Sequence, residues 1–278
     1  MTTWDRDKVI SSINNLVDAN LKGLDLSGLD FSKSNMISAI LTSANLKGAS
    51  LVETNLFAVK AMRADFSDAN LSGANLLKAN LTRANLQRSN LKDVEMTGIN
   101  LSDADLKKAD LTRTKLVEAN LPGVDLTGAD LSDAKLTGRY QREGYVSRGA
   151  NLKGGVLIGA KMHGADASGT DMIETDCSDV DFTNANLSEA NFKNARLKST
   201  CFVNTKLGDA DFRGAHVIDC DFLGAELIEA KFQGVDLSSA KNISAEELQS
   251  SQIDSETKVP DYIEVNWTSE DTYECKLV

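Results

Sequence analysis

Residues 64–88 read ADFSD ANLSG ANLLK ANLTR ANLQR, which is one five-residue unit repeated five times in succession. In each unit a large apolar residue is the third letter, a small residue is the first, and Asn or Asp stands between them. A period of five matches neither the 3.6 residues of a helical turn nor the alternation of a strand. The backbone must therefore repeat a compact geometry that contains its own turn.

The same spacing covers most of the chain. From Leu21 to Leu136 every fifth residue is Leu, Phe or Met except Ala61, and a second run extends from Leu152 to Leu237. If each unit forms one side of a square coil, the large and the small residue point inward and the other three point outward. Successive coils then stack at about the 4.8 Å spacing of paired strands. The sequence predicts an all-β solenoid of about 10 to 11 four-sided coils.

Phenylalanines in the second run give an internal check on four sides per coil. Between residues 182 and 237 every second unit has Phe at its centre, which is a period of ten within a coil of twenty. A square coil therefore predicts two vertical stacks on opposite sides, one formed by Phe182, Phe202 and Phe222 and the other by Phe192, Phe212 and Phe232.

The A(N/D)LXX unit resembles the repeat of the pentapeptide-repeat protein family, and the resemblance covers both runs. It implies a right-handed, four-sided parallel β-helix, and it suggests a bacterial protein, with cyanobacteria as the favoured source. Repeat scaffolds host unrelated functions, so the resemblance predicts the fold better than the activity. Some members mimic B-DNA and bind gyrase, a type II topoisomerase, which they modulate or protect from quinolones.

Departures from the repeat predict the domain limits. Val9, Ile13 and Leu16 have helical spacing, which predicts an amphipathic helix from about Trp4 to Val17 that covers the first coil. The expected parts are an N-terminal helical cap at 1–18, a first run at 19–138, an inserted loop at 139–149, a second run at 150–239, and a C-terminal cap with an acidic tail at 240–278.

The inserted loop is the first candidate for a binding site. Removing its eleven residues restores the five-residue register, and the segment is rich in arginine and tyrosine, which are frequent in binding hot spots. Either the loop is a tolerated surface insertion or it recognises a partner. The partner-binding residues would be Arg139, Tyr140, Arg142, Tyr145 and Arg148.

The C-terminal segment shows no repeat. Ser244 and Glu247 form a capping box for a short helix that ends at about Gln249. The remainder, as far as Val278, is strongly acidic and is expected to be extended or irregular. A mobile, solvated tail is the simplest interpretation of this composition.

An apolar column is the second candidate site. Ile37, Phe57, Leu77 and Val117 recur at steps of twenty on a surface that should be polar, with Thr97 between the last two. Ile40 and Met62 lie nearby around the corner. A stripe of this kind indicates contact with something. Either a partner protein docks there, or the C-terminal tail folds back over it with Tyr262, Ile263, Val265 and Trp267.

Charge narrows the function classes. The chain has 30 Lys and Arg against 41 Asp and Glu, a net charge of −11, which disfavours direct binding of nucleic acid or of an anionic membrane. Summed by side, the outward charges are net positive on the side that contains Lys22, Lys60 and Arg63, and net negative on the other three. Lysines interrupt the acidic sides, so DNA mimicry and gyrase binding are the less favoured alternative.

The sequence contains no recognisable catalytic or metal-binding motif. The two histidines, His163 and His216, join no nucleophile, and the four cysteines lack metal-ligand or disulfide spacing. We therefore expect no enzyme activity, catalytic residue, cofactor or metal. No secretory signal or membrane-spanning run is found, which favours a cytoplasmic location. The favoured function is a non-catalytic protein–protein interaction scaffold, monomeric or weakly dimeric, with an unidentified protein partner.

Overall fold

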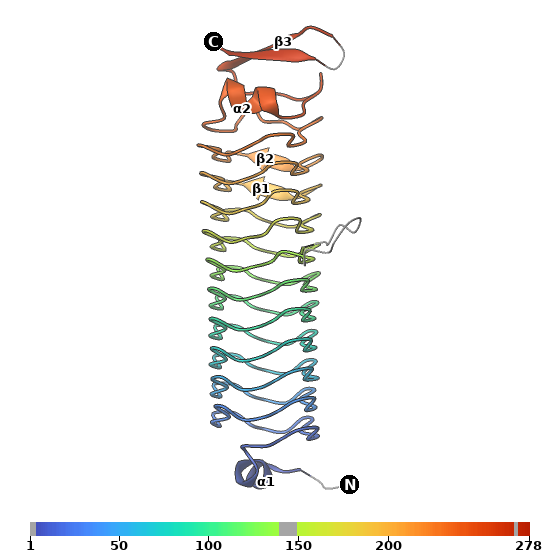
Figure 1. Ribbon diagram of the computed structural model, residues 1–278, viewed down its shortest axis with the longest axis vertical. Helices are drawn as coiled ribbons and strands as arrows, with labels where there is room; N and C mark the ends of the chain where they lie inside the picture. The colour runs from blue at the N-terminus through green and yellow to red at the C-terminus, as the bar shows by residue number, and fades with distance from the viewer. Residues whose placement is uncertain (1–3, 139–148, 270–271) are drawn as a thin grey trace.

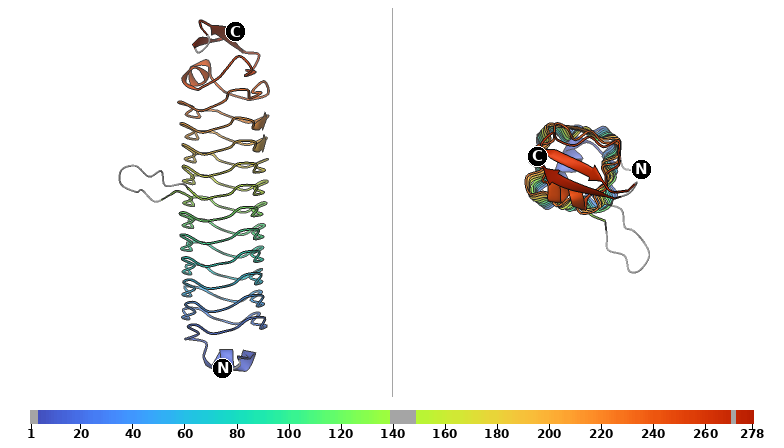
Figure 2. Two further views of the ribbon diagram at one scale, coloured as in Figure 1. Left: turned by 90° about the vertical axis from the view of Figure 1, so that its right-hand side faces the viewer. Right: turned by 90° about the horizontal axis from the view of Figure 1, so that it is seen from above.

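The structure is a computed structural model that describes residues 4–138, 149–269 and 272–278. It is a long rod of stacked coils (Figure 1) whose outline is square when seen along the axis (Figure 2). The residue before each centre pairs in parallel with the residue one coil further on. One such column contains, level by level, Asn15, Asn35, Asn55, Asn75, Glu95, Lys115, Lys135, Asp166, Asn186, Lys206 and Glu226. The prediction of four sides and twenty residues per coil is confirmed, whereas the right-handed sense stays an expectation from the family resemblance.

Each corner is a tight turn. The N–H of Ala79 donates to the C=O of Leu76 at 3.0 Å. Equivalent bonds, from the residue three places later to the centre, close the turns of other units. The third residue of the turn has a left-handed backbone, with a φ of +65° at Gly73 and +58° at Arg63. Glycine adopts this conformation freely, but a side chain is strained there, so the coil imposes it on Arg63.

The Asn or Asp before each centre stabilises the turn that follows. The Oδ1 of Asn80 accepts a hydrogen bond from the backbone N–H of Thr82 at 3.1 Å, and Asp65 does the same for Ser67 at 2.8 Å. Short polar side chains that bond to the backbone two residues on are typical of Asx turns. The second letter of the repeat is therefore fixed by turn chemistry.

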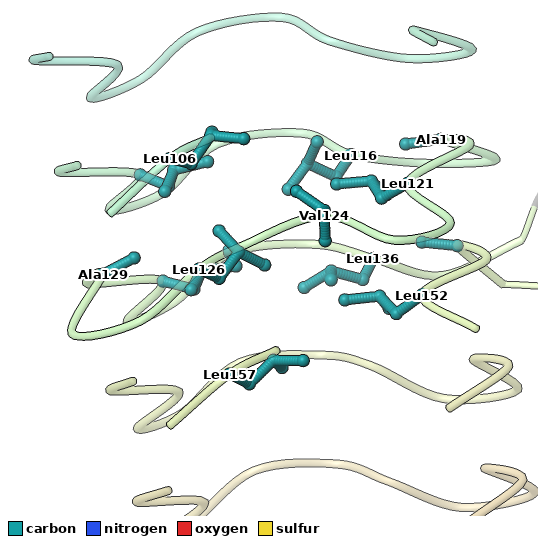
Figure 3. Close-up of a cluster of buried hydrophobic side chains, with 14 of the residues drawn as sticks. Leu106, Leu116, Ala119, Leu121, Val124, Leu126, Ala129, Leu136, Leu152 and Leu157 are labelled. Atoms are coloured by element: carbon teal, nitrogen blue, oxygen red, sulfur yellow. The ribbon is translucent and has the colours of Figure 1, made fainter. Parts of the chain in front are cut away.

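The interior is filled by the centres and the small residues before them. Leu106, Leu126 and Leu157 lie one above another in successive coils, and Leu116 and Leu136 form the column on the opposite side of the interior (Figure 3). All five are fully buried. A continuous apolar column of this kind is the stabilising core of a solenoid, because each coil buries its centres only against its neighbours.

The two phenylalanine stacks form as predicted. Phe182 stacks on Phe202 with ring centroids 5.5 Å apart, and Phe202 stacks on Phe222 at 5.1 Å. In the other stack Phe192 and Phe212 are 5.1 Å apart. Rings of the two stacks meet edge to face across the interior, with Phe182 and Phe192 6.1 Å apart. Both geometries are favoured for aromatic pairs.

The pairing also confirms the register across the inserted segment. Lys135 pairs with Asp166, and the N–H of Ala150 donates to the C=O of Leu136 at 2.6 Å, so the chain resumes its column after the extra residues. Of that segment, residues 139–148 lie outside the described residues. The loop hypothesis for Arg139, Tyr140, Arg142, Tyr145 and Arg148 therefore stays a prediction.

The N-terminal helix is shorter than expected. Helix α1 spans Arg6–Ser11, capped by the Asp5 side chain, instead of about Trp4 to Val17. Pairing of coils already begins at Asn15, so the expected limit of the cap at residue 18 is also wrong. The reason is that Leu16 is a repeat centre, fully buried in the first coil. Its burial in the solenoid outweighs continuation of a short helix.

The C-terminal segment is folded. Helix α2, Ala245–Ser250, has the expected capping box, in which the N–H of Glu247 donates to Ser244 Oγ at 3.1 Å. Gln252 and Lys258 then extend the columns of Lys231 and Asp236. Two short strands in the last coils, β1 Arg196–Lys198 and β2 His216–Ile218, pair in parallel.

The chain ends in an antiparallel hairpin of β3, Ile263–Trp267, and β4, Tyr273–Leu277. The hairpin lies across the C-terminal end of the rod (Figure 1), with Ile263 buried. The hypothesis that this segment covers the apolar column is wrong, because that column lies in the coils at the opposite end. Burying the open end of the core is the stronger demand on these apolar side chains.

Candidate interaction surface

The predicted apolar residues do form a column. The N–H of Ser38 donates to the C=O of Phe57, and the N–H of Ala58 donates to the C=O of Leu77, both at 2.9 Å. This places Ile37, Phe57 and Leu77 directly above one another. All three side chains are half-buried. Thr97, only 9% exposed, separates them from Val117.

A column of asparagines holds the backbone beside this stripe. The Oδ1 atoms of Asn55 and Asn75 accept hydrogen bonds from the N–H groups of Phe57 and Leu77, at 3.2 and 3.1 Å. The Nδ2 of Asn75 also donates to Asn55 Oδ1 at 3.3 Å, which links the two coils. The apolar side chains are therefore presented at fixed spacing from a preorganised backbone.

The register adds residues that sequence reasoning missed. Val17, 41% exposed, lies below Ile37, since the N–H of Asp18 donates to the C=O of Ile37 at 3.0 Å. Lys78 directly follows Leu77 at the same corner and is exposed. Counting back twenty residues from Ile37 is the signal that would have found Val17.

Unpaired cations lie along one side of the stripe. Lys60, Met62 and Arg63 follow Phe57 onto the next side of the coil, and Met62 is 39% exposed. In the described part of the chain, Lys22, Lys60, Arg63 and Lys78 have no carboxylate within ion-pair distance. We define the N-terminal face as the surface formed by Val17, Ile37, Phe57, Leu77, Met62, Lys22, Lys60, Arg63 and Lys78.

Several carboxylates elsewhere on the rod are paired with cations of neighbouring coils. Arg88 forms two hydrogen bonds to Asp68, of 2.7 and 2.8 Å, and Arg113 forms two of 2.7 Å to Asp93. These hydrogen bonds hold the pKa values of both carboxyl groups below the ordinary range. Lys107 Nζ lies 2.7 Å from Asp125. A DNA mimic needs a dense row of free negative charge, and these pairs interrupt it.

The family is decided by a repeat profile. The profile described as pentapeptide repeats is found in 8 copies. Together its matches cover residues 15–56, 64–103, 104–138, 148–176, 175–214 and 205–241. The chain belongs to the pentapeptide-repeat family. Among curated proteins, no relative matches it.

Three solved pentapeptide-repeat structures illustrate the likeness. HetL from Nostoc sp. strain PCC 7120, a protein involved in the regulation of heterocyst differentiation, is 24% identical over 82% of this chain and 97% of its own, with a TM-score of 0.45. A thylakoid-lumen protein from Arabidopsis thaliana is 37% identical over 34% of this chain and 68% of its own, with a TM-score of 0.28. The fluoroquinolone resistance protein QnrB1 is 16% identical over 86% of this chain and 91% of its own, with a TM-score of 0.35. Since these TM-scores lie below 0.5, we draw no function from them.

Nothing in the described part of this pentapeptide-repeat protein points to catalysis. Burial raises the pKa of Cys177 to about 12 and that of Cys220 to about 11, so neither thiol is activated. His216 belongs to a charged column in which Arg196 lies 3.8 Å from Asp176. The described residues contain no group of three or more side chains that could hold a metal ion. The expected lack of a cofactor stays a prediction.

Helices long and apolar enough to cross a membrane are absent from the described residues.

Proposed function

We propose that this pentapeptide-repeat protein is a non-catalytic scaffold that binds a protein partner through its N-terminal face. The observation that carries the proposal is the half-buried apolar column beside a group of unpaired cations, on a protein whose net charge is −11. Exposed apolar groups that gather in one place are typical of interaction sites. We also propose a cytoplasmic, bacterial protein that is a monomer or a weak dimer.

The chemistry of this face favours an acidic partner segment with apolar side chains. Phe57 and Leu77 would bury the apolar groups, while Lys60, Arg63 and Lys78 would attract carboxylates. The hydrogen-bonded backbone already holds these groups at a fixed spacing, so binding costs little conformational entropy. Electrostatic steering would make association faster at low ionic strength.

Affinity capture from the native cytoplasm, followed by titration of the purified partner, tests the proposal. The double variants Phe57→Ser/Leu77→Ser and Lys60→Glu/Arg63→Glu should each lose the partner that the unmodified protein retains. The matched control is Val52→Ser/Lys92→Glu, which changes one apolar and one basic residue of a column on another side and should bind normally. Equal binding by all four proteins refutes the N-terminal face as the interface.

The capture assay also tests the loop hypothesis, and a supercoiling assay tests the gyrase hypothesis. A variant without residues 139–149 should retain the partner if the N-terminal face is sufficient. Gyrase supercoiling should be unaffected by the protein, because ion pairs across coils, such as Arg88–Asp68 and Arg113–Asp93, interrupt its rows of negative charge. Inhibition or protection of gyrase would restore DNA mimicry as the function.

A further inference from the structure

The C-terminal hairpin has two unlike edges. In its ladder the N–H of Val278 donates to Tyr262 C=O and the N–H of Thr268 donates to Thr272 C=O. Paired residues alternate between bonded and non-bonded in an antiparallel ladder, so Val265 and Trp267 direct their N–H and C=O groups away from β4. The hairpin thus has an outer edge on each strand.

Helix α2 covers the outer edge of β4. The Nε2 of Gln249 donates to the C=O of Tyr273 at 2.7 Å, and its Oε1 accepts from the N–H of Cys275 at 2.8 Å. One side chain therefore satisfies two of the backbone groups that another strand would use. Covering an edge in this way is a common protection against unwanted strand pairing.

The outer edge of β3 has no such cover. Among the described residues, the N–H and C=O groups of Val265 and Trp267 have no hydrogen-bond partner. The strand reads IEVNW, so it also lacks the lysine, proline or bulge that usually blocks an edge. A cleft of about 500 Å³, lined by Ser255, Trp267, Thr268 and Ser269, adjoins its end.

We propose that the outer edge of β3 is a docking site for an extended, basic peptide segment of a partner protein, which adds to the hairpin as a third strand. Main-chain hydrogen bonds to Val265 and Trp267 would give the affinity. This site goes beyond the proposed function, since the hairpin lies at the other end of the rod from the N-terminal face (Figure 2).

Charge and side-chain alternation define the peptide. Glu256, Asp261 and Glu264 are exposed and have no ion pair within the described residues, so the surroundings of β3 attract a cation. Ile263, Val265 and Trp267 lie on the face of the hairpin that covers the rod, whereas Glu264 lies on the other face. A bound strand would alternate accordingly, with apolar residues beside Trp267 and basic residues beside Glu264.

A hexapeptide of alternating lysine and valine is the probe. The full-length protein labelled with ¹⁵N-tryptophan has only two tryptophans, so Trp4 serves as an internal control for Trp267. The peptide should shift the backbone N–H signal of Trp267 and slow its hydrogen exchange at least about tenfold, while Trp4 is unchanged. An unshifted Trp267 at saturating peptide overturns the proposal.

Two N-methylated versions of the peptide separate pairing from charge attraction. Methylation at the lysines and methylation at the valines block opposite edges of the added strand while the charge is kept. One version should lose binding and the other should retain it. If both bind as the parent does, attraction to the acidic surface is the whole effect and the proposal is wrong.

Val265→Pro removes the open N–H without removing a bond to β4, and prolines are tolerated on outer edges. We expect about tenfold weaker binding than for Val265→Ala, the control that keeps the N–H. Equal affinities for the two variants would contradict the site. Sedimentation of the unmodified protein tests whether a second copy of the chain occupies the edge. Self-association that Val265→Pro abolishes would overturn the assignment to a partner peptide.

Discussion

The two runs of the solenoid share one backbone and fill it differently. The first run is cored almost entirely by leucine, and its Phe31 and Phe66 have no ring partner among the described residues. The second run contains six stacked phenylalanines in two columns. Because each side of the coil is a separate vertical column, one column can change its chemistry while the others keep theirs.

The outer surfaces also differ between the runs. In the first run Ile37, Phe57 and Leu77 form a half-buried column, whereas Ile228 in the corresponding column of the second run is 64% exposed and stands above Gly208. An outward apolar side chain is therefore more buried in the column where large side chains follow one another than beside a glycine.

The largest effect is expected in the phenylalanine core. Phe202→Ala removes a ring that stacks on Phe182 and Phe222, and it should lower the free energy of unfolding by about 4 kcal/mol. Urea denaturation followed by far-ultraviolet circular dichroism measures the loss. A loss below about 2 kcal/mol would mean that the neighbouring coils collapse into the cavity.

A matched pair of milder variants sharpens the comparison between the runs. Phe202→Leu loses stacked and edge-to-face contacts, whereas Phe66→Leu loses no ring contact within the described residues. Phe202→Leu should therefore cost about 1 kcal/mol more than Phe66→Leu in the same denaturation experiment. Equal costs would show that the stacks contribute only through the area that they bury.

Acid sensitivity should also be greater in the second run. Burial alone would raise the pKa of Asp211, but hydrogen bonds from Arg213 and Lys193 outweigh it and bring the pKa to about 2. Its folded pKa is depressed, so its contribution to stability is present above about pH 4 and is lost as the pH falls toward 2.

Asp211→Asn should remove about 1 kcal/mol of this pH dependence between pH 4 and 2, after allowance for screening by solvent. Urea denaturation at each pH measures it. Asp93→Asn in the first run is the control, because Asp93 forms an exposed pair with Arg113 and should change the slope less. A larger change in pH dependence for Asp93→Asn than for Asp211→Asn would contradict the greater acid sensitivity of the second run.

The smallest effects are expected on the outer columns. Phe57→Ser should cost about 1 kcal/mol because Phe57 is half-buried, and Ile228→Ser should stay within about 0.5 kcal/mol. Thermal unfolding gives both values, and partner capture should be lost for the double variant that contains Phe57→Ser and kept for Ile228→Ser. Loss of more than about 3 kcal/mol at Phe57 would assign the column to the core.

The sequence predicted the structure correctly within the repeat, where the position of a residue in its five-residue unit decides whether it is buried. The centres, the small inward residues and the length of the insertion follow from the five-residue register, because each unit meets the same environment. It failed at both ends. Helical spacing at Val9, Ile13 and Leu16 predicted too long a helix, because Leu16 satisfies the repeat as well. The tail was expected to be mobile or to cover the stripe, and it covers the end of the rod.

The sequence alone determined the four-sided coil, the leucine core and the phenylalanine stacks, because a fixed period specifies which side chains must be buried and which residues lie one coil apart. Tertiary structure decided the rest through contacts that no local pattern encodes. It decided which of the charges one coil apart form ion pairs, as Asp68 does with Arg88, and it left Lys60 and Arg63 unpaired. It also placed Gln249 against one edge of the hairpin and left the edge of Val265 open, since those positions depend on how the last coil is capped.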